Sequence, residues 1–481
     1  MSSSTDTSTS SSGRTNALDK LNDNVPTAFI WRLTLLATLG GFLFGYDTSN
    51  IGSALAFIPY QLNSFATGYL VAGASLGAAA GALLAGPLTD RLGRKKVLVI
   101  DALIYAIGAL LCAFTWHVSV LMIARTLIGI AIGADSAIAT AYISEYAPKK
   151  RRGSLAMLQQ WMITVGILFA YLVALAILKI WPNASDVDWR WFFGLGAIPA
   201  IVGLFLRVEM PESPRWLIRK GRYDEAKDAF NKLEVDVTVD DVEYTAHQLE
   251  QADAKADRAK RKGWTPGVRR AVWVVCIFFV FQQITGINVP LYYGPVLLGK
   301  YFTSSHSLVA TTTAAIEVTT IMTLVNVIAT YFAFRFIDRI GRRKLAMGGF
   351  AGMAFFAIVA AIGLGVLSGT PRIWVGMIGL SLFIASFAIG VGGTGWLIQG
   401  EMFPTEVRGQ AASIAATVDW IANYALIEAF PASQRAIGLG WVLVCFAGLC
   451  VLAIAFVGKF LPETKELTVE QITEVFEKQA A

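Results

Sequence analysis

The feature that most restricts how this chain can fold is a long uncharged stretch near its middle. Between Arg270 and Lys300 the sequence carries no charged residue. About 20 apolar residues in a helix cross the ~30 Å hydrocarbon core of a bilayer, so this stretch is long enough to span a membrane. It also contains hydrogen-bonding side chains, which are costly in lipid unless they face a partner or a water-filled cavity. They are Gln282, Gln283, Asn288, Tyr292 and Tyr293.

These polar side chains have two interpretations. If the stretch is one helix, Gln282, Asn288 and Tyr292 lie close to one of its faces. Gly286 and Pro290 loosen the backbone between them. Polar side chains in a membrane helix can serve only to join neighbouring helices. Two glutamines, an asparagine and two tyrosines around a glycine and a proline favour a binding site for a polar solute instead.

Apolar runs recur along the whole chain of 481 residues. There are twelve, and 55% of all residues are hydrophobic while only 15% are charged, which excludes a soluble protein. The sequence therefore predicts an all-α membrane protein with twelve transmembrane helices in two six-helix bundles. The expected segments are a disordered tail at 1–27, the first bundle at 28–206, a charged helical linker at 207–269, the second bundle at 270–461 and a polar tail at 462–481.

Short motifs indicate that the two bundles are repeats of one another. The segment DRLGRK at 90–95 recurs as DRIGRR at 338–343, an offset of 338 − 90 = 248 residues. Glu145 matches Glu401 at 401 − 145 = 256, and Glu212 in PES matches Glu463 in PET at 463 − 212 = 251. Repeats in this arrangement place a solute site near the middle of the membrane, between the two halves.

Basic residues cluster on alternate connections between the runs, at 91–96, 149–152, 207–270, 339–344 and 408. The positive-inside rule then places the linker and both termini in the cytoplasm. Because the basic residues lie in these short clusters, the net charge of +6 does not indicate nucleic-acid binding. The four cysteines and three histidines lack metal-ligand spacing, and no motif indicates an enzyme or a cofactor.

These motifs resemble those of the major facilitator superfamily, and within it the sugar porter family. The resemblance covers nearly all of the membrane chain and rests on FGYD, DRLGRKK, SEYAPKKRRG, PESPRWL, QQITGIN, DRIGRRK, GEMFPTEVRG and PETKEL. QQITGIN, PESPRWL and PET are typical of sugar porters, whereas DRLGRKK is shared by the wider superfamily. The resemblance implies alternating access, in which the two bundles rock around a central, sugar-like ligand.

The resemblance also implies which side chains hold that ligand. Amides suit a sugar because each can both donate and accept hydrogen bonds, as a hydroxyl group does. Tryptophans offer aromatic faces to the C–H side of the ring, and Tyr292 and Tyr293 resemble the family's extracellular gate. An acid, Asp419, stands where sugar porters usually carry an amide, and it can accept from a hydroxyl or take up a proton. The expected ligand-binding residues are Gln160, Gln282, Gln283, Asn288, Asn326, Trp396, Trp420 and Asp419.

Two charged residues deep in apolar runs, Asp47 and Arg125, are expected to form a proton-coupling pair. A charge at the centre of a bilayer costs roughly 2.5–3.5 kcal/mol even on generous scales, and pairing offsets that cost. A structural ion pair is the other interpretation. The resemblance favours coupling, because proton-coupled sugar porters carry Asp at this position and facilitators carry a neutral residue. Asp135 is a further candidate for a proton or substrate site, since an acid there is similar to that of proton-coupled phosphate porters.

A third set of charges lies at the basic ends of the runs. Topology explains the basic residues of this set but not the acids found with them at repeat positions. We expect these residues to latch the two halves together on the inside when the protein faces outward. They are Asp90, Arg94, Glu145, Arg152, Glu212 and Arg215 in the first half, and Asp338, Arg342, Glu401, Arg408 and Glu463 in the second.

The favoured hypothesis is a proton-coupled symporter for a monosaccharide or polyol, a multi-pass protein of the plasma membrane that works as a monomer. Its partners are then the solute, the proton and the lipid bilayer. An uncoupled sugar facilitator and a proton-coupled phosphate or organic-anion porter are the alternatives. Asp47 argues against the first alternative. The amide-rich seventh run argues against the second, because anion sites favour Arg and Lys.

Overall fold

The computed structural model describes residues 16–25, 27–148, 152–181, 189–261, 264–302, 307–403, 407–465, 467 and 469–480. The first half of the chain forms α1 (Ala17–Asp23), α2 (Ala28–Ala37), α3 (Leu39–Ala54), α4 (Ser64–Leu92), α5 (Arg94–Ala113), α6 (Val118–Tyr146), α7 (Arg152–Ile180), α8 (Arg190–Gly194) and α9 (Ala197–Val208). The linker forms α10 (Pro214–Arg219), α11 (Tyr223–Lys232) and α12 (Val239–Arg261). The second half forms α13 (Pro266–Ile284), α14 (Asn288–Phe302), α15 (Leu308–Ile340), α16 (Arg342–Gly365), α17 (Gly369–Phe387), η1 (Ala388–Gly392), α18 (Gly393–Glu401), α19 (Arg408–Ile437), α20 (Leu439–Phe460) and α21 (Val469–Ala480).

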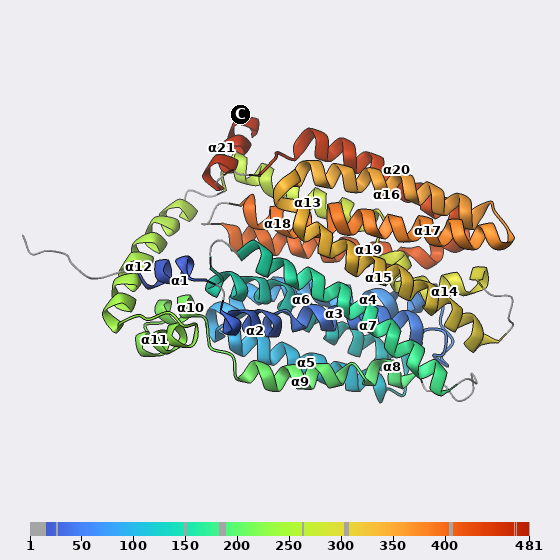
Figure 1. The fold of residues 1–481 in the computed structure, drawn as a ribbon, viewed down its shortest axis with the longest axis horizontal. Coiled ribbons are helices and arrows are strands. Elements are labelled where there is room, and N and C mark those ends of the chain that lie inside the picture. The colour runs from blue at the N-terminus through green and yellow to red at the C-terminus, as the bar shows by residue number, and fades with distance from the viewer. Residues whose placement is uncertain are drawn as a thin grey trace, which may run out of the picture.

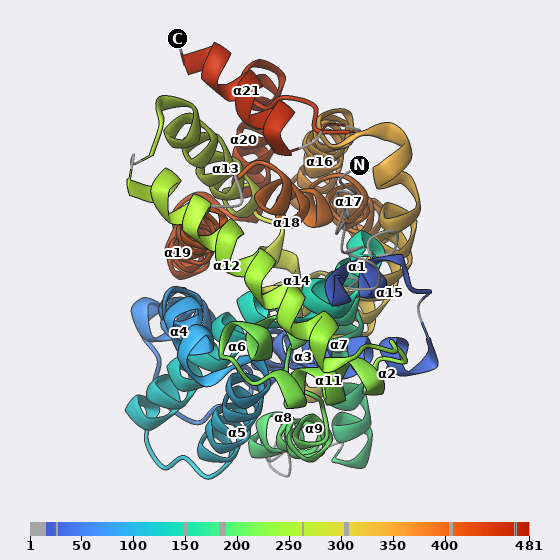
Figure 2. The same cartoon turned by 90° about the vertical axis from the view of Figure 1, so that its left-hand side faces the viewer.

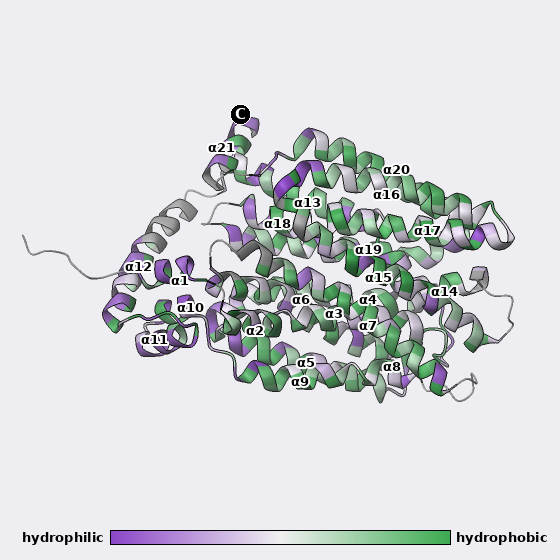
Figure 3. Ribbon diagram, in the orientation of Figure 1, coloured by the Kyte–Doolittle hydropathy of each residue, from purple (hydrophilic) through white to green (hydrophobic). Residues whose placement is uncertain are grey.

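The long helices lie side by side, and α1, α10, α11, α12 and α21 gather at one end of them (Figure 1). We call this the linker end, and the opposite end, near α8, the loop end. Seen from the linker end, the two halves occupy opposite sides and α12 runs across them (Figure 2). Hydrophobic residues dominate the long helices, and hydrophilic residues concentrate at the linker end (Figure 3). This all-helical architecture confirms the predicted fold class.

Eleven helical segments of the described chain are long and apolar enough to cross a membrane. The twelfth is α19, which has 30 residues but is made more polar by Asp419, Asn423 and Glu428. Since α19 packs along α4 and α13, its Asp419 and Asn423 are buried in protein rather than exposed to lipid. The structure is therefore consistent with the twelve predicted spans.

Four of the predicted runs are divided in the structure. The first run is divided into α2 and α3, the sixth into α8 and α9, and the tenth into α17, η1 and α18. The seventh run ends one helix at Ile284 and begins another at Asn288, because Gly286 adopts a φ of +89° that glycine tolerates best. The polar residues of this run therefore meet across a bend at Gly286, one of the two residues expected to loosen the backbone, and not along one continuous helical face.

The repeated DRLGRK and DRIGRR segments form the same turn in both halves. Gly93 joins α4 to α5 with a φ of +95°, and Gly341 joins α15 to α16 with a φ of +97°. A side chain at either glycine would strain the backbone. It would also meet a carboxylate, since an added Cβ would lie 2.2 Å from Glu212 Oε2 at Gly93 and 2.6 Å from Glu463 Oε2 at Gly341. The glycine thus lets the acid of PES or PET reach the start of the next helix.

Glycines also bring helices of the first half into backbone contact. An added Cβ at Gly77 of α4 would lie 2.1 Å from the carbonyl oxygen of Thr126 in α6. One at Gly45 of α3 would lie 2.0 Å from the carbonyl oxygen of Ile163 in α7. Small residues permit such close packing in membrane proteins. This packing brings α4 against α6 and α3 against α7, and α3 also contacts α6, where buried charges of the two helices meet.

The linker end differs from the sequence predictions at two points. Residues 1–15 lie outside the described residues, but Ala17–Asp23 of the expected disordered tail is helical. This helix, α1, is fixed to α12, where Lys20 Nζ donates to Asp241 Oδ2 at 2.9 Å. In addition, α9 continues to Val208, so Arg207 lies inside the first bundle rather than in the linker. The polar C-terminal tail forms α21, which packs on α13.

Candidate functional site

A cavity of about 80 Å³ lies between the two halves. α3 and α7 line it from the first half, and α13, α14, α15, η1, α18 and α19 line it from the second. Asn423 lines the cavity although the sequence analysis did not identify it; its spacing of four residues from Asp419 places both on one face of α19. All eight predicted ligand-binding residues line it as well: Gln160, Gln282, Gln283, Asn288, Asn326, Trp396, Trp420 and Asp419.

Hydrogen bonds connect the polar side chains of the cavity wall. Gln283 Nε2 donates to Asp419 Oδ1 at 2.8 Å, and Gln283 Oε1 accepts from Asn288 Nδ2 at 2.9 Å. Asn288 Nδ2 also donates to Asn423 Oδ1 at 3.1 Å. Asn423 Nδ2 donates in turn to Ser75 Oγ of α4 at 3.1 Å, so the network reaches from the second half into the first. These bonds orient the amides and fix which donors and acceptors face the cavity.

Two buried polar atoms of cavity residues have no hydrogen-bond partner within the described protein. Gln282 Nε2 donates to the carbonyl group of Gly392 at 3.2 Å, but Gln282 Oε1 has no donor. The indole Nε1 of Trp420 has no acceptor. Buried polar groups normally have partners, and a hydroxylated ligand in the cavity can satisfy both atoms. Among the described residues, no group of three or more His, Cys, Asp or Glu side chains is placed to hold a metal ion.

The expected pair of Asp47 and Arg125 forms and is almost fully buried. Arg125 Nη1 donates to Asp47 Oδ1 at 2.7 Å and to Oδ2 at 2.8 Å, and the two side chains are 0% and 2% exposed. Arg125 Nε also donates to the carbonyl group of Leu70 at 2.8 Å. The next residue on α3, Thr48, lines the central cavity. The ion pair and the cavity are thus one residue apart on the same helix.

Asp135 is placed in a different cluster. Its Oδ1 accepts from Arg207 Nη2 at 2.6 Å, and Arg207 Nη1 donates to Asp101 Oδ1 at 2.9 Å. The sequence analysis missed Asp101 and assigned Arg207 to the linker. The available signal was an acid inside the third apolar run and an arginine at the end of the sixth. Only the packing of α5, α6 and α9 brings the three charges together.

The two halves touch at the loop end beside the predicted gate. The Tyr171 hydroxyl of α7 donates to the carbonyl group of Leu291 in α14. α3 passes close to α14, since an added Cβ at Gly52 would lie 2.1 Å from the carbonyl oxygen of Tyr292. Tyr292 lines the cavity, and the hydroxyl of Tyr293 donates to the carbonyl group of Ile427 at 3.0 Å. Both tyrosines are 2% exposed and lie next to this contact between the halves.

Comparison with known proteins agrees with this geometry. A family model described as "Sugar (and other) transporter" matches residues 33–476. The chain belongs to the sugar porter family of the major facilitator superfamily. It is 36% identical to the glucose transporter GlcP of Staphylococcus epidermidis over 91% of this chain and 95% of that protein. It is also 32% identical to the arabinose-proton symporter of Bacillus subtilis over 96% of this chain and 100% of that protein.

Solved structures show the same sugar porter fold. The proton:xylose symporter XylE of E. coli, bound to 6-bromo-6-deoxy-D-glucose, matches with a TM-score of 0.77 and 29% sequence identity. The match covers 94% of this chain and 100% of XylE. The family and these relatives are transporters, in agreement with the transport function expected from the sequence.

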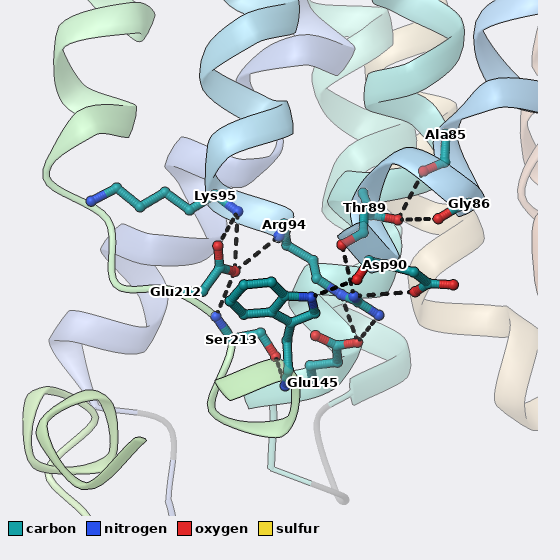
Figure 4. Close-up of polar contacts among 10 residues, drawn as sticks. Ala85, Gly86, Thr89, Asp90, Arg94, Lys95, Glu145, Glu212 and Ser213 are labelled. Carbon is teal, nitrogen blue, oxygen red and sulfur yellow. Dashed lines mark hydrogen bonds and ion pairs between the residues drawn. The ribbon is translucent and has the colours of Figure 1, made fainter. Parts of the chain in front are cut away.

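In this sugar porter the charges at the linker end form one network in each half. In the first half, Glu212 Oε1 accepts from the backbone N–H of Arg94 at 2.9 Å and of Lys95 at 3.2 Å, at the start of α5 (Figure 4). A carboxylate suits this place because the first N–H groups of a helix lack partners inside the helix. Arg94 also pairs with Glu145 at 2.9 Å and with Asp90 at 3.4 Å.

The second half of the sugar porter repeats this arrangement. Glu463 accepts from the backbone N–H of Arg342 at 2.8 Å, at the start of α16, and Arg342 Nη2 pairs with Glu401 at 2.8 Å. Arg342 thus corresponds to Arg94, and each of these pairs joins residues of one half.

The remaining residues of the predicted charge network are placed as follows. Arg408 Nε donates to the carbonyl group of Phe403 at 3.2 Å. Burial lowers the pKa of Arg215, an effect that the nearby Glu145 carboxylate opposes. The side chains of Arg152 and Asp338 lie outside the described part of the structure.

Proposed function

We propose that this sugar porter is a proton-coupled symporter that carries a monosaccharide or polyol by alternating access. The observation that carries the proposal is the chemistry of the central cavity. Its described lining contains six amide side chains and two tryptophans but no lysine or arginine. Relatives of this chain bear the names glucose transporter, D-xylose transporter and arabinose-proton symporter, which supports the same solute class.

The cavity suits a sugar in two ways. Gln160 and Asn326 face it from opposite halves, and the network around Gln283 presents further oriented amides. Each amide can pair with a hydroxyl group as donor or as acceptor. Trp396 and Trp420 add apolar faces for the C–H groups of the ring. We assign Asp419 to a hydroxyl group as well, because Gln283 orients its Oδ1 beside the cavity.

We assign proton coupling to Asp47 and Arg125. When Asp47 is ionised, its carboxylate holds Arg125 through the two short hydrogen bonds. When Asp47 takes up a proton, it no longer attracts the Arg125 guanidinium as a charge. Arg125 and α6 are then free to move relative to α3. Because Thr48 follows Asp47 and lines the cavity, such movement is transmitted to the ligand site. Protonation and binding of the solute are thereby linked.

We infer that the linker end faces the cytoplasm and that the protein lies in the plasma membrane and acts as a monomer. The basic clusters at that end support this orientation by the positive-inside rule. The loop end is closed by the contact of Tyr171 with Leu291 and of Gly52 with the Tyr292 carbonyl group. We therefore assign the structure to an inward-facing state, with Tyr292 and Tyr293 as the closed outer gate.

Within this cycle we assign the linker-end charges to a latch. In the outward-facing state the Arg94 and Arg342 networks of the two halves approach each other and hold the inner side closed. In the structure each network remains inside its own half, through Glu145 and Glu401 respectively. This arrangement is the one expected when the latch is open.

One experiment separates this proposal from its alternatives. Purified protein in liposomes is tested for uptake of labelled glucose, xylose, arabinose, myo-inositol and phosphate, with and without an inward proton gradient. We expect one sugar or polyol to accumulate only when the gradient is present. Sugar uptake that equilibrates regardless of the gradient would indicate a facilitator. Gradient-driven phosphate accumulation without any sugar uptake would overturn the proposal.

A further inference from the structure

The first half contains a second buried charge cluster, apart from the Asp47–Arg125 pair. Arg207 lies in the last turn of α9 and donates to Asp101 of α5 at 2.9 Å and to Asp135 of α6 at 2.6 Å. Its guanidinium also donates to the carbonyl groups of Leu98 at 2.9 Å and Ala37 at 3.2 Å. The three charged side chains are between 1% and 4% exposed.

The charge of this cluster is unbalanced. With both acids ionised, it holds two negative charges and one positive charge. A net charge in a buried site is strongly disfavoured, and two neighbouring carboxylates resist simultaneous ionisation. One bound proton makes the cluster neutral, because one acid then pairs with the guanidinium as a carboxylate while the other is a carboxylic acid.

An unpartnered oxygen independently points to a proton. Asp101 Oδ2 is buried and has no hydrogen-bond partner, which is uncommon for a polar atom inside a protein. Two nitrogens of one guanidinium hold the two acids, so the Asp101 and Asp135 carboxyl groups share a single cation. A proton on Asp101 Oδ2 makes the unpartnered oxygen a neutral hydroxyl group and leaves Asp135 as the single carboxylate that balances Arg207.

The cluster adjoins a second cavity of about 60 Å³. Gln159 of α7 lines this cavity, and its Nε2 donates to Asp135 Oδ2 at 3.4 Å. Gly40 of α3 lines it too, and an added Cβ there would lie 1.7 Å from the same oxygen. The cavity extends toward the linker end along Thr140 of α6. The lining of this cavity is mostly apolar, but it includes the polar side chains of Ser136, Thr140, Gln159 and Gln160. These side chains can hydrogen-bond to water, which is the carrier that a proton needs.

We propose that Asp101, Asp135 and Arg207 form a second proton-binding site, which holds one proton between the two acids and exchanges it with the cavity beside Gln159. On binding, a carboxylate oxygen takes a proton from a hydronium ion in the cavity, forms an O–H bond and leaves a water molecule. On release, the O–H bond breaks, the proton passes to a water molecule as hydronium, and both acids are ionised. The site is separate from Asp47, and the proposal does not depend on which solute the protein carries.

Within the cluster the exchangeable proton belongs to the carboxyl groups of Asp101 and Asp135, because the Arg207 guanidinium keeps its charge. The charged groups come from α5, α6 and α9, while α2, α3 and α7 supply uncharged ones. In the part of the chain that the structure describes, the groups that face the cluster are Asp101, Asp135 and Arg207, the carbonyl groups of Leu36, Ala37 and Leu98, Gly40 and the amide of Gln159.

The test is proton counting on the purified full-length protein without solute. Infrared absorption reports protonated carboxyl groups at neutral pH, and a dye reports protons released after a jump to alkaline pH. We expect Asp101→Asn and Asp135→Asn each to lose the signal of one protonated carboxyl group and to release one proton fewer. The reason is that the remaining acid and Arg207 form a neutral pair. Asp224→Asn, at an exposed acid of α11, is the matched control and changes neither signal.

A third variant tests whether the proton reaches the cluster through the cavity beside Gln159. Gln159→Leu keeps both acids, so we expect an unchanged infrared signal but slower replacement of its proton by deuterium. The proposal is wrong if folded Asp101→Asn and Asp135→Asn both retain the full carboxyl signal and proton release. If one of these variants fails to fold, the other still tests the proposal, because each variant leaves a single acid to pair with Arg207. Loss of solute uptake with unchanged proton counts would concern the proposed transport function and not this site.

Discussion

The two buried acid–arginine sites of the first half differ in charge balance and not in burial. At one site the Arg125 guanidinium faces a single carboxylate, and both oxygens of Asp47 accept from it. At the other, Arg207 faces two acids. The exposed fractions of all five side chains lie between 0% and 4%. When Asp47 loses its proton, the first site becomes a neutral ion pair. When the second site loses its proton, two carboxylates face one guanidinium and the site carries a net negative charge.

The two sites adjoin neighbouring cavities, which share Phe44, Gln160, Ile163, Trp396 and Trp420 in their linings. Asp47 precedes Thr48 at the central cavity, while Asp135 lies against Gly40 beside the cavity that extends toward the linker end. Gly40 and Asp47 are 47 − 40 = 7 residues apart on α3, which is about two helical turns. Both sites thus involve residues of α3, so we expect a movement of this helix to affect both.

The largest effect is expected at Asp47 and Arg125, where one acid balances one arginine. Asp47→Asn removes the proton acceptor, so gradient-driven accumulation should fall to equilibration, with the inside and outside solute concentrations about equal. Exchange of labelled solute across the membrane should continue, because the central cavity remains. Uptake and counterflow in the same liposomes measure the two activities, with Asp224→Asn as the control. Accumulation that survives in Asp47→Asn would exclude this acid as the coupling group.

A large loss of stability is expected at the unbalanced cluster. Arg207→Leu leaves two buried acids without their cation, and breaking a buried ion pair by removing one partner costs about 3–5 kcal/mol. Thermal unfolding of the detergent-solubilised protein measures the loss. Adding Asp101→Asn and Asp135→Asn to Arg207→Leu should restore most of the stability, because no charge is then left buried. Arg32→Leu is the control, since its pair with Glu209 is exposed and 3.8 Å long.

An intermediate effect tests whether the second half binds the solute while the first half exchanges the proton. Gln283→Ala removes the partner of both Asp419 and Asn288. It also removes one amide from the cavity wall, and a lost hydrogen bond to a solute hydroxyl group costs about 0.5–1.5 kcal/mol, which is about a 2- to 12-fold loss of solute affinity. Proton release measured without solute should stay as in the unmodified protein. A change in proton release with unchanged solute affinity would contradict the assignment of solute binding to the second half.

The smallest effect is expected at the linker end, where the charge pairs are partly exposed. The Glu145 and Glu401 side chains are 13% and 27% exposed, and pairs of this kind contribute about 0–1 kcal/mol. Glu145→Gln should shift the population modestly toward the inward-facing state, with Glu401→Gln as the equivalent change in the other half. Chemical labelling of a cysteine introduced at Thr140 reports access from the inside. Unchanged labelling in both variants would exclude the latch.

The expected solute site could be read from the sequence because its residues lie in recognisable local motifs. Gln282, Gln283 and Asn288 belong to one short segment, and Trp420 follows Asp419 directly. The structure places all of them at one cavity, although the helix is broken between Gln283 and Asn288. Asn423 was missed because it belongs to no motif, and only its hydrogen bonds to Asn288 and Ser75 reveal its place in the network.

The sequence by itself determined the pattern of apolar runs, the repeat of the two halves and eight residues of the central cavity, because apolar run length and local motifs are encoded along the chain. Only the tertiary structure decided that Arg207 is buried in the first bundle and that it holds both Asp101 and Asp135. These residues come from three runs with no common motif, and 207 − 101 = 106 residues separate the first from the last. Whether a buried charge has a partner depends on how helices pack, and hydrophobic periodicity carries no information about that.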